Sequence, residues 1–366
     1  MVSKKPFDFG IFIVVLFLLA VGIIMISSAS SAYALHHHGN SYLFLTKQLA
    51  WAGLGIVIML IVSRIDYRFW GRFSGLLFTI SIALLMVVLI PHIGAVRNGA
   101  QRWINLGFTE FQPSEVMKLA LIIFFAYRLS KDKDKISSFW SGLLPYLMWI
   151  GLIIGLLLLQ PHMSSAGVIV FLGIILLFVA GARIWHFIML AFPTLTLAAV
   201  AIMFSSYRLK RVTTFLDPWS DPKGDGWQII QSLYAIGSGG LFGLGLGRSR
   251  QKFLYIPEPH NDFIFSILAE ELGYIGVLVV LIAFLIFIWR GLKIAMNAQD
   301  SFGSLLAAGI TSLVAIQALI NILVVTSSMP VTGMPLPFFS YGGSSLLFLM
   351  VGMGILLNIS RSAAYK

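Results

Sequence analysis

Long apolar runs alternate with short polar segments along almost the whole chain. A helix that crosses a bilayer needs about 20 mostly apolar residues. The pattern therefore predicts ten membrane-spanning helices, whose ends it fixes only to within several residues. The predicted spans are residues 9–30, 44–63, 73–91, 113–129, 141–160, 165–182, 185–204, 262–289, 302–326 and 338–359. No internal repeat is visible, and the longest segment outside the spans is 205–261.

The composition supports this membrane assignment. Of the 366 residues, 58% are hydrophobic and 11% are charged, whereas a soluble domain carries about 25% charged residues. These proportions exclude an ordinary soluble protein. We expect an all-α fold: a single polytopic membrane domain over residues 1–366, with about ten transmembrane helices and one large extracytoplasmic loop, residues 205–261.

Basic residues predict the orientation, because short cytoplasmic segments carry an excess of Lys and Arg. With the N-terminus inside, the short outer segments hold only Lys47, Arg97 and Arg102. The cytoplasmic segments hold Lys4, Lys5, Arg64, Arg68, Arg72, Arg128, Lys131, Lys133, Lys135, Arg183, Arg290, Lys293, Arg361 and Lys366. We expect both termini in the cytoplasm. The first span could be a signal peptide cleaved near Ala34, but its apolar core exceeds the usual 7–15 residues, which favours an uncleaved anchor.

The chain has no cysteine and a net charge of +11. Disulfides and thiolate metal sites are therefore excluded, and cytoplasmic Lys and Arg near anionic lipid account for the charge without nucleic acid. The segment 205–261 is also basic, which indicates either a solvated loop paired with its own acids or an anion-binding surface. Its cations are Arg208, Lys210, Arg211, Lys223, Arg248, Arg250 and Lys252, against Asp217, Asp221, Asp225 and Glu258.

Three acids lie at the start of the eighth span, in "HNDFIFSILAEELG". Asn261 or Asp262 could cap this helix, whose dipole favours a carboxylate at its N-terminus. Alternatively, Asp262 displays its carboxylate to a substrate, next to the stiff polar segment "PEPH". In a regular helix, at about 100° per residue, Glu271 lies on the face opposite Asp262. We therefore expect Glu270 and Glu271 to make polar contacts within the bundle or to line a cavity, as intramembrane acids usually do.

Other motifs carry candidate polar groups near helix ends. In "QPSEVMKLA", Lys118 follows Glu115 at i+3, within pairing reach, and either closes a helix start or lines a cavity. Arg102 and Trp103 in "GAQRWI" suit membrane anchoring, and His162 lies in the turn "QPHMSS". The Gly-rich run 235–252 lacks dinucleotide-motif spacing and predicts a flexible or re-entrant loop. The Pro-, Gly- and Ser-rich segment 326–348 indicates a kinked helix entrance or a polar cavity wall.

Four of these motifs resemble the SEDS family (shape, elongation, division and sporulation) of peptidoglycan glycosyltransferases. They are "GAQRWI", "QPSEVMKLA", "GRSRQKFLYIPEPHNDFIF" and "PLPFFSYGGSS", and the third is closer to the division and sporulation branch, FtsW and SpoVE, than to RodA. The resemblance implies polymerisation of lipid II into glycan strands at the outer leaflet of the bacterial plasma membrane. The context would be cell division, cell shape or sporulation. A class B penicillin-binding protein would be the transpeptidase partner, alongside other division proteins, with no nucleic acid.

The resemblance also assigns roles to residues. Asp262 would be the general base that takes a proton from the acceptor sugar hydroxyl, with inversion at the donor anomeric carbon. Glu258 would orient the base or bind a divalent cation, Mg or Mn, and no organic cofactor is implied. Substrate-binding residues would be Arg102, Trp103, Lys118, Arg208, Arg211, Lys252, Glu258, Ser340, Tyr341 and Gly342.

Two alternatives stay open at this point: a lipid II transporter (flippase) and a non-catalytic division scaffold. The polar groups gather in outer segments rather than at the midplane, where a transporter would place them, and this favours polymerisation. One departure concerns His162, since many members of the family carry an acid there. If His162 replaces that acid functionally, we expect an additional titration of activity near pH 6–7.

Overall fold

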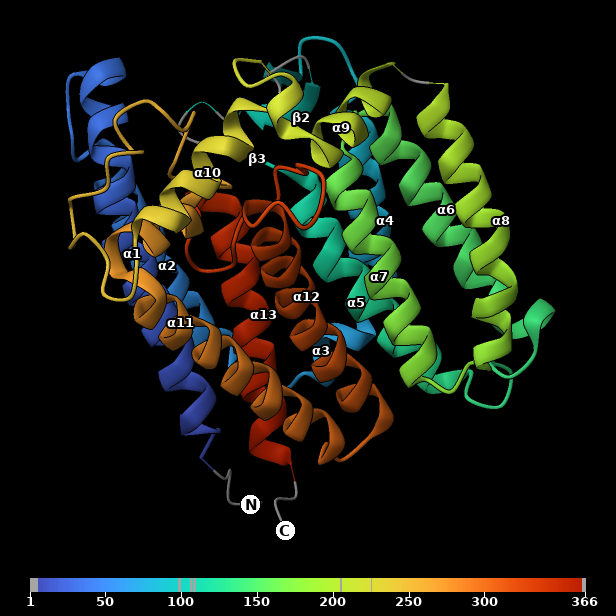
Figure 1. Cartoon of the computed structure of the whole chain (residues 1–366). Helices are drawn as coiled ribbons and strands as arrows, with labels where there is room; N and C mark the ends of the chain where they lie inside the picture. Colours follow the sequence, from blue (N-terminus) through green and yellow to red (C-terminus); the bar gives the residue numbers. More distant parts are fainter. Residues whose placement is uncertain are drawn as a thin grey trace.

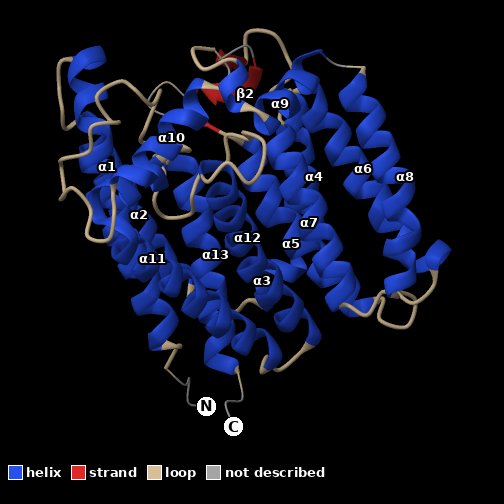
Figure 2. Ribbon diagram, viewed as in Figure 1, coloured by secondary structure: helices blue, strands red, loops and turns tan. Residues whose placement is uncertain are grey.

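The structure, a computed structural model, describes residues 6–97, 100–105, 107, 110–204, 206–224 and 226–363. It is a bundle of helices with a small sheet at one end (Figures 1 and 2). The long helices are α1 (Phe9–His38), α2 (Leu43–Val62), α4 (Ser74–Val87), α5 (Pro113–Lys131), α6 (Leu144–Leu159), α7 (Met163–Val179), α8 (Ile184–Met203), α11 (Ile264–Met296), α12 (Ser301–Val325) and α13 (Gly343–Ser362). A short helix, α3 (Arg68–Arg72), joins α2 to α4.

Each of the ten predicted spans coincides with one of these long helices. Within the described residues, six segments are long and apolar enough to cross a membrane, and α4 and α7 are apolar but shorter. The six segments are α1, α2, 139–159 (which contains α6), α11, α12 and α13. The chain is therefore a multi-pass membrane protein, and the figure of ten crossings stays a prediction.

The interior of the bundle is formed around α12 and α13, which Figure 1 places among the other helices. Buried small residues on α12 (Ala307, Ala308 and Gly309) allow close helix approach, as is common between helices in membranes. A Cβ at Gly309 would lie 2.6 Å from Ile122 Cγ2 of α5. This close approach packs the middle of α5 against α12.

The fold is mostly helical, as expected, and a small three-stranded antiparallel sheet adds to the helices. Its strands are β1 (Gly94–Arg97), β2 (Ala100–Asn105) and β3 (Glu110–Phe111), in the order β1-β2-β3. Ala95 pairs with Trp103, next to a bulge between Ala95 and Val96. The helix-length criterion missed these strands because they are short and lie between two apolar runs.

The segment 205–261 is only partly a loop. It contains α9 (Ser206–Leu216), the 3-10 turn Pro218–Ser220 and α10 (Trp227–Ser238). These elements lie at the same end of the bundle as the sheet (Figure 2). The expectation of a single large loop therefore needs correction, and its extracytoplasmic location stays a prediction.

Helix α11 is interrupted at Gly273, whose φ of 65° and ψ of −169° are not helical. Residues 239–245, hereafter the Gly-rich strap, bond to the backbone on both sides of the break. Leu244 and Gly245 donate to the carbonyls of Glu270 and Glu271, at 2.9 and 3.0 Å. The amides of residues 274 and 275 donate to the carbonyls of residues 240 and 241, at 2.9 and 3.2 Å. The run predicted as a flexible or re-entrant loop thus completes a broken helix.

Candidate active site

Asp262 lies in the turn that leads into α11, two residues before the helix begins at Ile264. It does not cap α11: the N-cap position is occupied by Phe263 and makes no side-chain capping bond. The angular argument that placed Glu271 opposite Asp262 on one regular helix therefore does not apply. Asp262 is instead positioned by elements from other parts of the chain.

The segment 330–341, between α12 and α13, forms one side of the site. A Cβ built on Gly333, whose φ is +63°, would lie 3.6 Å from Asp262 Oδ2. The backbone of this segment therefore lies next to the carboxylate. Glycine allows this backbone conformation, which L-residues with side chains rarely adopt.

The surroundings of Asp262 favour its protonated form more than water does. Burial, together with the nearby Glu258 carboxylate, raises the pKa of Asp262 to about 6, although its own backbone hydrogen bond and the charge of Arg211 act in the opposite direction. A carboxyl group with a pKa near neutrality suits proton abstraction at physiological pH. The side chain is half-buried, so part of it stays accessible at the surface.

Two predicted partners accompany Asp262. Glu258 has a left-handed backbone conformation, with φ of 47°, and its Oε2 accepts a hydrogen bond of 2.7 Å from Asn261 Nδ2. Arg211 on α9 donates to the Val331 carbonyl at 2.9 Å. The side chain of Arg208 lies outside the described part of the structure, so its predicted role is not addressed by these contacts.

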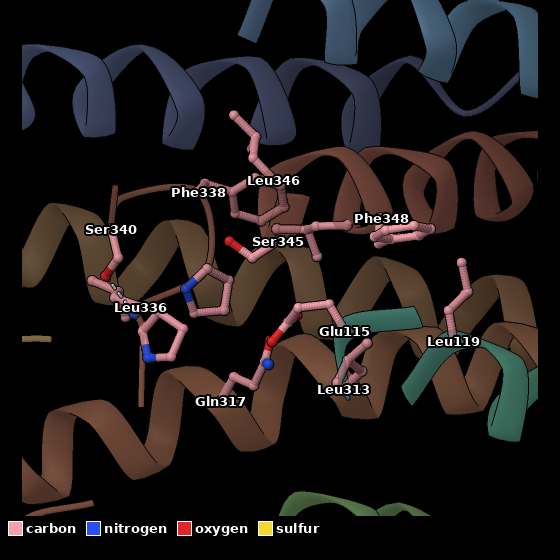
Figure 3. A pocket seen from close by; sticks show the side chains of 13 residues that line it. Glu115, Leu119, Leu313, Gln317, Leu336, Phe338, Ser340, Ser345, Leu346 and Phe348 are labelled. Carbon is pink, nitrogen blue, oxygen red and sulfur yellow. Dashed lines mark hydrogen bonds between the residues drawn. The ribbon is translucent and has the colours of Figure 1, made fainter. Parts of the chain in front are cut away.

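Glu115 and Lys118 form the predicted pair at the start of α5, with Lys118 Nζ 2.7 Å from Glu115 Oε1. Both side chains are buried. Glu115 also lines a cavity between α5, α12, α13 and the segment 335–340, together with Gln317 and Ser340 (Figure 3). The remaining lining residues are Leu119, Leu313, Pro335, Leu336, Pro337, Phe338, Ser345, Leu346, Phe348 and Leu349. The pair thus closes the start of α5 and Glu115 lines the cavity, whereas the substrate-binding role of Lys118 stays a prediction.

Arg102 and His162 meet at the turn between α6 and α7. Arg102 donates to the carbonyls of Gln160 and Pro161, which fastens β2 to this turn. His162 is buried, and its Nε2 lies 3.0 Å from Ser165 Oγ. Burial, reinforced by the charges of Arg102 and Lys118, lowers the pKa of His162 to about 3. Protonation of this imidazole near pH 6–7 is therefore disfavoured, which argues against the expected additional titration.

Trp103 follows Arg102 in β2 and is half-buried. Three further predicted binding residues, Ser340, Tyr341 and Gly342, lie on the segment that joins α12 to α13. Ser340 Oγ donates to the carbonyl of Asn261, and the amide of Tyr341 donates to the carbonyl of His260. Gly342 is the N-cap residue of α13. Ser340 and Tyr341 therefore adjoin the Asp262 turn, and Gly342 follows them at the start of α13. Contact of these residues with substrate stays a prediction.

Lys252 has an interior role that differs from the predicted one. It is 3% exposed, and its Nζ lies 3.1 Å from Glu271 Oε1 and 3.0 Å from Ser28 Oγ of α1. We therefore revise the expectation for Lys252, because its ammonium group is already paired with a carboxylate inside the bundle. Its role in binding substrate has no support in these contacts.

Glu270 and Glu271 make the polar contacts within the bundle that we expected. Glu270 accepts hydrogen bonds from the Ser249 hydroxyl and the Arg250 amide, and Glu271 accepts from the Ser28 hydroxyl and the Ser249 amide. The two acids thus bind the segment after the Gly-rich strap to α11 and α1.

Sequence reasoning missed Asn321 and Gln317, which lie on α12 near the site. Asn321 is 1% exposed and donates to the carbonyl of Asp262, and Gln317 lines the cavity. The signal was present in the sequence, because both are amide side chains inside the apolar span predicted for 302–326. A polar group at such a position is expensive unless it has partners.

Within the described ranges, no three His, Asp or Glu side chains gather closely enough to hold a metal ion by themselves. In enzymes that act on phosphate-containing substrates, Mg²⁺ commonly binds through one or two protein carboxylates plus the phosphate oxygens of the substrate. Glu258, beside Asp262, could supply one such carboxylate.

Comparisons with known proteins identify relatives along the full length. The profile of the FtsW/RodA/SpoVE family, described as cell cycle protein, matches residues 9–365. Stage V sporulation protein E of Bacillus subtilis (strain 168) is 48% identical over 366 residues, covering 100% of both chains. Probable peptidoglycan glycosyltransferase FtsW of Trichlorobacter lovleyi is 46% identical over 98% of this chain and 96% of the relative.

A solved structure shares the fold. A chain from a structure of a peptidoglycan synthase complex, concerned with the coordination of polymerization and crosslinking, superposes with a TM-score of 0.82 and 30% identity. The match covers 99% of this chain and 98% of that chain.

Proposed function

Because the chain belongs to the FtsW/RodA/SpoVE family of cell cycle proteins, we propose that it is a peptidoglycan glycosyltransferase that polymerises lipid II at the outer leaflet. The observation that carries this proposal is Asp262, a half-buried carboxyl group in the turn that leads into α11. Its raised pKa, about 6, suits a general base. The names of the relatives, which include a probable peptidoglycan glycosyltransferase, agree with this chemistry.

The proposed reaction joins two lipid-linked sugars. The 4-hydroxyl oxygen of the acceptor attacks the anomeric carbon of the donor, while the Asp262 carboxylate takes the hydroxyl proton. The bond from the anomeric carbon to the diphosphate oxygen breaks, and undecaprenyl diphosphate leaves with the bonding electron pair. Attack from the face opposite the leaving group inverts the configuration at the anomeric carbon.

Cations would stabilise the charge that develops on the diphosphate. We favour Arg211 for this role, because its positive charge already acts on Asp262. Arg102, Lys118 and Arg208 remain candidates from the resemblance. A divalent cation held by Glu258 would supply further charge neutralisation when bound.

A second candidate function is transport of lipid II. The observation that favours it is the buried Glu115–Lys118 pair beside the cavity inside the bundle, since transporters place charged groups within the membrane. The proposed partner is a class B penicillin-binding protein, and the similar chain from a peptidoglycan synthase complex supports such an assembly. We further propose a plasma-membrane location with both termini cytoplasmic.

Purified protein in complex with its cognate penicillin-binding protein, supplied with lipid II, tests the proposal. We expect wild type to produce glycan polymer and Asp262→Ala to produce at least about a hundredfold less, because the loss of a general base typically costs 10²–10⁴-fold. Equal polymer from both would refute the base assignment. No polymer from either, together with movement of lipid II across vesicles, would favour transport.

A further inference from the structure

Three consecutive backbone carbonyls in the Asp262 turn accept hydrogen bonds from other parts of the chain. The carbonyl of His260 accepts from the Tyr341 amide at 2.9 Å, and that of Asn261 accepts from Ser340 Oγ at 2.7 Å. The carbonyl of Asp262 accepts from Asn321 Nδ2 at 2.7 Å. Of these three donors, Asn321 contacts the peptide of the proposed base itself, and it comes from a different element, α12.

The Asn321 amide makes a second bond that connects the two sides of the site. Its Nδ2 also donates to the carbonyl of Met334, again at 2.7 Å. Met334 follows Gly333, whose backbone lies next to the Asp262 carboxylate. One side-chain amide thus bridges the peptide of the base and the segment that forms the opposite wall of the site.

The orientation of this amide follows from its partners. Both neighbours are carbonyl oxygens, which only accept hydrogen bonds, so the two N–H groups of Nδ2 must face them. Asn321 Oδ1 is buried without a partner in the described structure. An apolar helix tolerates a buried amide only where its hydrogen bonds offset the cost of desolvation. The two carbonyls therefore account for the presence of an asparagine here.

We infer that Asn321 is a positioning residue for the glycosyltransferase reaction, which fixes Asp262 relative to the 330–341 segment from the interior of the membrane bundle. This inference rests on the proposed function. Asn321 does not contact the reacting atoms through any bond described here. It acts through the backbone of Asp262. Its loss should therefore lower the rate of the chemical step more than the affinity for lipid II.

Asn321→Ala tests this role, because it removes both donors without adding charge. A displacement of about 1 Å at a reacting group can cost about a hundredfold in rate. We expect kcat for polymerisation to fall at least about tenfold with KM within about twofold of wild type, the signature of an interaction that serves the transition state. We also expect the acid limb of the rate to move to lower pH, because a less confined Asp262 is better solvated.

Thr311→Ala is the matched control. Thr311 lies on the same helix, is also 1% exposed, and also donates to a backbone carbonyl, that of Ala307 at 2.8 Å. It does not bond to the Asp262 turn. We expect its kcat within about twofold of wild type, and thermal midpoints of both variants separate a loss of rate from a loss of stability. Equal kcat for the two variants, or a fall in Asn321→Ala without a shift in pH dependence, would overturn the inference.

Asn321→Ser keeps the test decisive if the alanine variant does not fold. The serine side chain is too short to reach either carbonyl and can donate instead to the carbonyl one turn earlier on α12, so it removes both bonds without leaving an unpaired buried group. A reduced kcat supports the inference and wild-type kcat overturns it. Asp262→Ala in the same assay distinguishes failure of the positioning role of Asn321 from failure of Asp262 as the base. An inactive Asp262→Ala with a fully active Asn321→Ala refutes only the positioning role, whereas an active Asp262→Ala refutes the proposed base.

Discussion

The charge state of one carboxyl group governs the proposed chemistry. Asp262 can accept a proton only when it is ionised, and burial together with the charge of Glu258 raises its pKa to about 6. The rate should therefore be highest above this pH and should fall as the pH decreases through about 6. Glu258 and Arg211 act on the same group with opposite signs, which makes their effects separable.

Neutralising these two neighbours should move the acid limb in opposite directions. In Glu258→Gln the loss of a negative charge makes ionisation of Asp262 easier, so the limb of kcat/KM should shift to lower pH. In Arg211→Gln the loss of a positive charge makes ionisation harder, so the limb should shift to higher pH. Polymerisation rates measured between pH 4.5 and 8, about 1.5 units below and 2 above that pKa, test both shifts. A common direction for both variants would exclude Asp262 as the titrating group.

At the scale of elements, α11 is broken at Gly273, and the Gly-rich strap that bonds to both sides of the break ties this part of the bundle together. The break at Gly273 frees backbone groups that need partners inside a membrane protein, and the Gly-rich strap provides them. Glu270 and Glu271 then bind the segment that follows the strap. The first turns of α11 directly follow Asp262. They are held in place by hydrogen bonds to their backbone and to the side chains of Glu270 and Glu271.

Gly273→Ala should destabilise the protein strongly. Its φ of +65° disfavours an L-residue, and a Cβ would lie 2.2 Å from the backbone nitrogen of Gly243. Strained backbone of this kind costs about 1–3 kcal/mol before the clash is counted. Gly155→Ala on α6 is the control, since nothing lies within 4 Å of its Cβ. Thermal unfolding in detergent measures both, and an unchanged midpoint in Gly273→Ala would contradict this account of the break.

Local pattern predicted the elements better than it predicted their connections. The apolar runs located ten helices because each run is long compared with the uncertainty of its ends. The pairing of Lys118 with Glu115 was also predictable, because both lie on one helix. The pairing of Lys252 with Glu271 was not, since it depends on a strap that docks on a broken helix. Asn321 was visible in the sequence as an amide inside an apolar span, but its role was not predictable, since both of its partners are backbone carbonyls that only the tertiary fold brings together.

At the scale of the whole molecule, the two ends of the bundle differ in character. The sheet, α9 and α10 lie at one end (Figure 2), with the Asp262 turn, and the connection from α11 to α12 lies at the other (Figure 1). The start of α1 and the end of α13 also meet, since the Asp8 amide donates to Ser360 Oγ at 2.9 Å. An even number of crossings requires the two termini to share one side of the membrane, which agrees with this contact.

The absence of cysteine from the sequence allows the proposed orientation to be tested with single introduced thiols. Lys223→Cys, near α10, should react with a membrane-impermeant maleimide in intact protoplasts. Gln299→Cys, between α11 and α12, should react only after the membrane is permeabilised. Both side chains are exposed, so accessibility depends on the side of the membrane. The reverse labelling pattern would invert the topology and place Asp262 on the cytoplasmic face.

The broken helix also has a consequence for biogenesis. The Gly-rich strap precedes α11 in the chain, so the ribosome completes it before the residues whose backbone it must satisfy. As α11 is synthesised, the partners for its unpaired groups already exist, and the nascent helix can be closed at its break while the C-terminal part of the protein is still unmade. The strap is thus synthesised before the part of α11 to which it forms hydrogen bonds.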